Sequence, residues 1–307
     1  MPMNTFSSEI LRKIHKETSF YGLNSDQFLL SLFVFPQIWM DIDFIALTSG
    51  DDTYSSYSQF FDENGNYRIL SQLQEIYHLP ADKRTALDKD LIKIDEQVNI
   101  LYQLFTHMIP GVYPHSEDPT HTWYNLGDNL SVFAEQDSIF ISESFHNYLS
   151  EVRLSLNTKD WSKPNEILNE IFEYQLTNDK ASLIKTNKIN AELKYNNLNI
   201  FKSSRLGYFI LGGILLVVAF MQLMNRRKWM RFIAVLLISG IVIVFTYHTY
   251  GMGLRWYISG YAPWSNSYET MVYVAWATVM AGFVFGRKNI LTLSLATLFG
   301  GVILFVS

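Results

Sequence analysis

The chain has 307 residues, a hydrophobic fraction of 49%, no cysteine and a formal net charge of −5. The charge is divided unevenly, because residues 206–307 hold a single acid, Glu269, and seven of the 24 basic residues. The front part, residues 1–205, therefore carries a net charge of −11 and the remainder +6. This division excludes a single soluble globule, and the acidic front part excludes a basic nucleic-acid binder. The lack of cysteine excludes disulfides, thiolate metal sites and cysteine nucleophiles.

The front part is predicted to be a mainly helical domain, because apolar residues recur at helical spacing in several stretches. Predicted helices cover residues 8–18, 25–35, 67–78, 81–108, 129–156, 164–176 and 179–199. Ser25 and Asp26 cap the second of these and Pro36 limits it. A short strand is expected over 43–47, a turn over 62–67 and a loop over 110–128.

The helix over 81–108 carries an apolar stripe at spacings of three and four, which predicts one buried face. The stripe consists of Leu87, Leu91, Ile94, Val98, Leu101 and Leu104.

A short stretch of the loop that follows holds two histidines and two acids. They are His115, Glu117, Asp118 and His121. Imidazole and carboxylate are usual metal ligands, so a metal site is one interpretation. The other is a solvated turn, which we favour because no histidine pair at helical spacing supports a rigid site. We therefore assign no metal site, and no nucleophile motif assigns a catalytic residue.

Four apolar stretches in the second part predict a membrane domain. They cover residues 206–224, 232–250, 268–286 and 290–307, and each is long enough to cross a hydrocarbon core as a helix. The predicted fold is therefore mostly α: an extracytoplasmic helical domain, residues 1–205, followed by a polytopic α-helical membrane domain, residues 206–307. That domain has four spans, of which the last is truncated.

The basic turns predict the orientation. Residues 225–231 contain four bases and residues 286–289 contain two, which is typical of cytoplasmic loops. The connection over 251–267 and the front domain are then outside. An exported domain needs a signal peptide or an earlier span. The apolar run over 28–40 is too short for a membrane span. We therefore expect a fragment that lacks sequence at both ends.

Residues 247–276 are rich in aromatic side chains, with nine tyrosines or tryptophans among thirty residues. An aromatic belt at the membrane surface accounts for this without a function. It does not account for Arg255 and Glu269, which stand at the ends of adjacent spans. Ionisable groups near a bilayer usually pair, so we expect an ion pair between them.

The run LRWYISGYAPWSNSYETMVYVAW, residues 254–276, resembles the CcsA/ResC-type cytochrome c biogenesis proteins of the system II pathway. The matched positions are Arg255, Trp256, Tyr257, Gly260, Ala262, Pro263, Trp264, Ser265, Asn266, Tyr268, Glu269 and Trp276. Residues 88–99 and 118–124 look, more loosely, like the periplasmic region of the long fused ResB–CcsA form. The resemblance covers most of the chain, which is identified as an internal fragment of that form.

The resemblance implies a role in cytochrome c biogenesis, in which the family exports heme and attaches it to apocytochrome c outside the membrane. It implies heme as cofactor, apocytochrome c and a ResB-like portion or subunit as partners, and the bacterial inner membrane as location, with residues 1–205 periplasmic. The family's Trp-rich heme-binding loop would follow residue 307, so the synthetase-like attachment activity belongs to the full-length family. Tyr261 departs from the family, in which histidine is common at that position.

Nine of the matched residues are candidates for a heme region: Arg255, Trp256, Tyr257, Gly260, Pro263, Trp264, Asn266, Glu269 and Trp276. His248, near the outer end of the second span, is either a heme ligand or a packed histidine that hydrogen-bonds a neighbour. The alternative interpretation of the whole chain is a membrane-anchored extracytoplasmic binding or scaffold protein that does not handle heme.

Overall fold

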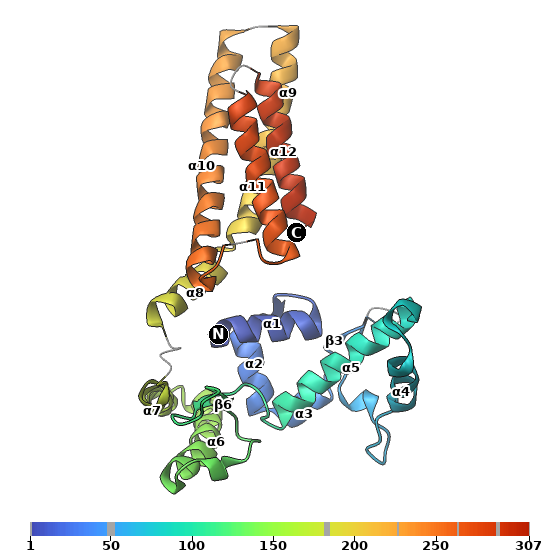
Figure 1. The fold of residues 1–307 in the computed structure, drawn as a ribbon, viewed down its shortest axis with the longest axis vertical. Helices are drawn as coiled ribbons and strands as arrows, with labels where there is room; N and C mark the ends of the chain where they lie inside the picture. Colours follow the sequence, from blue (N-terminus) through green and yellow to red (C-terminus); the bar gives the residue numbers. More distant parts are fainter. Residues whose placement is uncertain are drawn as a thin grey trace. The chain divides into compact units, whose positions relative to one another are not determined.

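The computed structural model describes residues 2–47, 53–180, 185–225, 227–262, 264–286 and 289–306. Contacts divide the chain into two compact units, of which the second begins at Lys185. Both units are mainly helical, as predicted (Figure 1). The helix α8 (Thr186–Leu198), which lies within the predicted front domain of residues 1–205, belongs by its contacts to the second unit.

The first unit combines α-helices with very short antiparallel strands. Its α-helices are α1 (Met3–His15), α2 (Ser25–Val34), α3 (Pro36–Met40), α4 (Leu70–His78), α5 (Ala86–Phe105), α6 (Glu135–Thr158) and α7 (Ser162–Asn178). Its strands pair as β1 (Ser19–Phe20) with β2 (Leu23–Asn24), β3 (Ile45–Ala46) with β4 (Tyr54–Ser55), and β5 (Tyr113–Pro114) with β6 (Trp123–Tyr124). Single 3-10 turns are η1 (Ser58–Phe60), η2 (Ala81–Lys83) and η3 (Leu130–Val132).

Side-chain caps define where two of these helices begin. The predicted cap of α2 is wrong by one residue, because Asn24 forms a reciprocal capping box with Gln27. Thr85 and Asp88 form the same arrangement at the start of α5. The predicted helix over 81–108 is therefore shorter at its beginning, where η2 occupies the first three residues.

The core of the first unit lies where α5 and α6 meet α1, α2 and the β3 strand. Val98, Leu101 and Leu104 of the predicted apolar stripe are buried in it, whereas Leu87 is exposed. The stripe therefore becomes a core face only in the second half of α5.

Truncating the buried end of this stripe is expected to destabilise the first unit. Leu101→Ala removes a fully buried side chain and should lower the free energy of unfolding by about 2–5 kcal/mol. Leu87→Ala, on the exposed part of the same helix, should change it by less than about 0.5 kcal/mol. Hydrogen exchange of α5 in the purified chain checks this, and equal protection of the two variants would contradict the position of the core.

The region over 110–128 is not only a loop, as the sequence predicts, because it contains the β5–β6 pair. The three prolines of this region favour a loop prediction, and the two strands are only two residues long each. Tyr113 of β5 is buried, and its hydroxyl lies 2.8 Å from Ser144 Oγ of α6. The pair therefore closes a second small core together with Phe133, Ile141 and Ile171.

The second unit is a bundle of apolar helices (Figure 1). After α8 come α9 (Ile200–Met224), α10 (Lys228–Ser259), α11 (Ser267–Phe285) and α12 (Ile290–Val306). The helix α12 packs between α9 and α11, and α10 packs against α8 and α9. Asn199, in the left-handed conformation with φ 46°, separates α8 from α9.

Three helical stretches of the described chain are long and apolar enough to cross a membrane. They are Thr186–Met224, which joins α8 and α9, and the helices Lys228–Ser259 and Ser267–Phe285. The fourth predicted span, 290–307, corresponds to α12, which is apolar and 17 residues long. A count of four spans therefore remains a prediction.

The helix α10 continues to Ser259, beyond Tyr250, where the second span is predicted to end. The end of that span stays a prediction. Gly251 does not interrupt this helix. A Cβ atom at Gly251 would lie 2.7 Å from Ile200 Cγ2, so the glycine allows α9 to approach α10 closely. What the sequence predicts as a loop over 251–267 is thus helical for more than half of its length.

Candidate functional site

The candidate site is the connection between α10 and α11. Gly260 ends α10 in the left-handed conformation, with φ 81°, which glycine adopts without strain. Asn266 begins α11, because its Oδ1 accepts a hydrogen bond from the backbone N–H of Glu269 at 2.8 Å. The two caps leave a connection of seven residues, 260–266, of which Pro263 lies outside the described residues.

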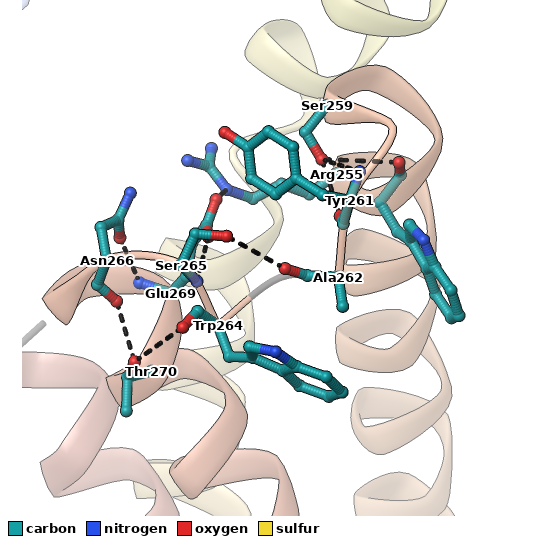
Figure 2. Close-up of polar contacts among 10 residues, drawn as sticks. Arg255, Ser259, Tyr261, Ala262, Trp264, Ser265, Asn266, Glu269 and Thr270 are labelled. Carbon is teal, nitrogen blue, oxygen red and sulfur yellow. Dashed lines mark hydrogen bonds and ion pairs between the residues drawn. The ribbon is translucent and has the colours of Figure 1, made fainter.

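The predicted ion pair between Arg255 and Glu269 is present at this connection. Arg255 Nε donates to Glu269 Oε1 at 2.7 Å. The backbone N–H of Ser265 donates to the other carboxylate oxygen, Oε2, at 2.9 Å (Figure 2). The Glu269 side chain is 1% exposed and that of Arg255 29%. A buried carboxylate with both oxygens hydrogen-bonded thus ties the end of α10 to the start of α11.

Aromatic rings from two helices flank the Arg255 guanidinium. Its Cζ lies 5.9 Å from the ring centre of Tyr195 on α8 and 5.6 Å from that of Tyr268 on α11. Both distances allow a cation–π interaction. In addition, Lys188 of α8 donates to the carbonyl oxygen of Ile258 at 3.1 Å. Sequence reasoning missed Tyr195 and Lys188, because nothing in their local pattern indicates a contact with a segment some 60 residues away.

The aromatic candidates fall into two groups. Trp256, Tyr257 and Trp264 are exposed, with Trp256 at 57% and Trp264 at 59%. Tyr261, which is not one of the candidates, is exposed as well. Figure 2 shows the Trp264 ring turned away from the polar contacts around Glu269.

Trp276 does not belong with these exposed rings. Its Nε1 donates to Thr249 Oγ1 at 2.9 Å, and its ring stacks on Phe245 at 5.5 Å between centres. The structure therefore places Trp276 in the contact between α10 and α11, where it packs the two helices together.

His248 is fully buried between α9, α10 and α11. Its Nδ1 lies 3.1 Å from the Tyr208 hydroxyl, and its ring packs edge-on against Phe201. The ring also faces the backbone of Val272, and Nε2 is buried without a hydrogen bond of normal geometry among the described residues. The geometry matches the packed histidine of the sequence analysis, and a ligand role stays a prediction.

Tyr208→Phe tests how strongly His248 depends on its hydrogen bond with Tyr208. The change removes the partner of Nδ1 in a buried imidazole, which should cost about 1–3 kcal/mol of bundle stability. Tyr247→Phe provides the control, because that hydroxyl bonds the Leu198 carbonyl at a half-buried position. SDS-induced unfolding of the purified protein measures both, and a larger loss in Tyr247→Phe would contradict this account.

The histidine-containing loop of the first unit has the geometry of a turn. Asp118 accepts hydrogen bonds from the backbone N–H of Thr120 and Thr122 and from the Thr120 hydroxyl. These bonds lower the pKa of Asp118 to about 2. His115 packs edge-on against Phe133, with its Nε2 3.0 Å from the Val132 carbonyl oxygen. Asp118 is therefore held within the turn, and His115 is held by contacts with Val132 and Phe133.

Comparison with known proteins gives one extended similarity. No family model matches the chain. The chain is 29% identical over 313 residues to Protein NrfI of Wolinella succinogenes. The alignment covers 99% of this chain and 34% of NrfI, so the chain spans about a third of the length of that relative.

Proposed function

We propose that this chain is the part of a cytochrome c biogenesis protein that handles heme in the membrane and helps to deliver it to apocytochrome c on the outer side. The observation that carries the proposal is the α10–α11 connection. There the ion pair between Arg255 and the buried Glu269 fixes a short loop, and four aromatic side chains are left exposed around it. The resemblance of residues 254–276 to the system II proteins supports the same role.

The exposed rings suit a flat, apolar ligand. Trp256, Tyr257 and Trp264 offer large aromatic faces at the end of the bundle, and such faces stack well on a conjugated ring system. When bound, the heme would supply the reactive vinyl groups, and the chain's own residues would bind and orient it. The ion pair contributes by holding the loop, and hence Trp264, in one position.

His248 fits a heme only in part. Its buried Nε2 is a nitrogen of the right kind for an axial ligand. The imidazole is nevertheless enclosed by Phe201 and Tyr208, with no exposed surface. We therefore attribute ligand contact to the exposed aromatic side chains and derive no ligation by His248.

The orientation follows from the bases at the opposite end of the helices. Arg227, Lys228 and Arg231 lie between α9 and α10 or in the first turn of α10, which favours a cytoplasmic position for that turn. The α10–α11 connection then lies on the outer side of the bacterial inner membrane, together with the front domain. A ResB-like portion or subunit is the expected neighbour in the same membrane.

The exposed tryptophans should be needed for cytochrome c formation. Trp256→Ala and Trp264→Ala, introduced into the natural gene, should each lower the yield of heme-containing cytochrome c by about threefold or more, since an aromatic contact contributes about 0.5–1.5 kcal/mol beyond burial. Heme staining of cytochromes, normalised to the amount of the variant protein in the membrane, is the measurement.

Trp229→Ala is the matched control, because this tryptophan is 51% exposed at the other end of α10. It should leave the yield unchanged. Unchanged yields in Trp256→Ala, Trp264→Ala and Glu269→Gln alike would remove the functional role of the loop and favour the scaffold alternative.

A further inference from the structure

A pair of histidines in the first unit stands apart from the candidate heme region. His107 follows the C-terminal end of α5, and His146 lies on α6. Their ring centres are 5.5 Å apart, with the ring planes at 85°. Nothing in the proposed heme-handling function uses this pair.

The backbone of His107 has the left-handed conformation, which is usually found at glycine residues. Beyond the cap residue Thr106, the His107 N–H donates to the Leu104 carbonyl and the Met108 N–H to the Gln103 carbonyl. These two bonds form a Schellman motif, in which the left-handed position is usually glycine. His107 occupies it with φ 56°. Histidine at this position therefore has a conformational cost that glycine would not have.

The ring of His107 is half-buried and has no hydrogen bond from its side chain among the described residues. It packs against Phe145 at 5.5 Å and Phe33 at 5.8 Å, in addition to His146.

His146 has the arrangement that is typical of a metal ligand. Its Nδ1 lies 3.0 Å from the carbonyl oxygen of Ser142, one turn earlier on α6. An N–H donated to a carbonyl fixes the tautomer and leaves Nε2 as the unprotonated nitrogen. The residue is exposed.

The spacing of the two rings suits one shared ion. Two imidazoles that bind one ion at about 2.0–2.1 Å hold their ring centres about 4.5 Å apart at a coordination angle of 90° and about 5.2 Å apart at the tetrahedral angle. The observed 5.5 Å is within about 0.5 Å of the tetrahedral value, a difference that a small side-chain rotation removes. No cluster of three or more histidines and acids that could hold a metal is found in the described residues, so such a site would be open and completed by water.

We propose that His107 and His146 form a binding site for a divalent transition-metal ion, with two imidazole nitrogens as protein ligands. Cu²⁺ is expected to bind most tightly and Zn²⁺ more weakly, in the usual order for nitrogen ligands. The site belongs to the first unit and does not depend on the proposed role in heme handling.

The test is a Cu²⁺ titration of the purified protein, made without a histidine tag and freed of metal. Electron paramagnetic resonance should show one bound Cu²⁺ per chain with two imidazole nitrogens as ligands. His146→Gln and His107→Asn should each weaken binding by about tenfold or more. Asparagine tolerates the left-handed backbone at 107, and His146 is exposed, so at least His146→Gln should fold normally.

His121→Asn is the matched control, because His121 also has a left-handed backbone, with φ 54°, and lies in the other histidine-containing loop. It should leave Cu²⁺ binding unchanged. The proposal is overturned if the unaltered protein shows no Cu²⁺ with two imidazole ligands. It is also overturned if His146→Gln and His107→Asn bind as the unaltered protein does, or if His121→Asn weakens binding equally.

Discussion

Replacing Arg255 with methionine is expected to destabilise the helix bundle by about 3–5 kcal/mol. The change leaves the Glu269 carboxylate, which is 1% exposed, with the backbone N–H of Ser265 as its remaining hydrogen-bond donor. A buried charge that loses its partner keeps its desolvation cost without the compensating attraction. Glu269→Gln should cost less, about 1–3 kcal/mol, because glutamine still accepts from Ser265 and the Arg255 side chain is 29% exposed. Helical circular dichroism during unfolding in SDS micelles measures both.

The double variant Arg255→Met with Glu269→Gln provides the control. It removes both charges together, so it should be more stable than Arg255→Met alone, as neutral replacements of buried ion pairs often are. A double variant that is no more stable than either single variant would contradict the pairing. A greater loss in Glu269→Gln than in Arg255→Met would contradict the assigned burial.

A leucine at Gly300 is expected to disrupt the contact between α11 and α12. A Cβ atom at this position would lie 2.5 Å from Val279 Cγ2 and 3.3 Å from the carbonyl oxygen of Ala275. The backbone oxygen cannot move aside without shifting α11, so the helices must separate. Such overpacking costs about 1–3 kcal/mol or more, and it should appear as faster hydrogen exchange in both helices.

Gly213→Leu on α9 is the matched control. A Cβ atom at Gly213 meets nothing within 4 Å, and leucine is the better helix former. This variant should be as stable as the unaltered protein or slightly more so. Comparable losses of stability for the two glycines would show that α12 does not pack on α11 as described.

Much of the bundle could be predicted from local properties of the sequence. Long apolar runs place α9, α10 and α11, and the Arg255–Glu269 pair followed from two isolated charges at the ends of adjacent helices. The extension of α10 past Gly251 could not be predicted, because glycine is read locally as a helix breaker. Here the absence of a side chain at Gly251 leaves room for Ile200 of α9.

Contacts between distant segments account for the rest of what was missed. The position of Tyr195 beside Arg255 depends on how α8 meets α10, and no periodicity in α8 encodes it. The β5–β6 pair is likewise held by Tyr113 packing against α6, rather than by strand propensity in two-residue segments. Local patterns specify the elements, whereas the site is completed by packing between them.

The absorption spectrum of the protein purified from its natural gene tests the central claim most directly. We expect a Soret band from bound heme. The double variant Trp256→Ala with Trp264→Ala should lose at least about fivefold of that absorbance per protein, since two aromatic faces together contribute about 1–3 kcal/mol. Trp229→Ala should retain the full band. A colourless unaltered protein, or the same Soret absorbance in the double variant, would contradict heme handling at the α10–α11 connection.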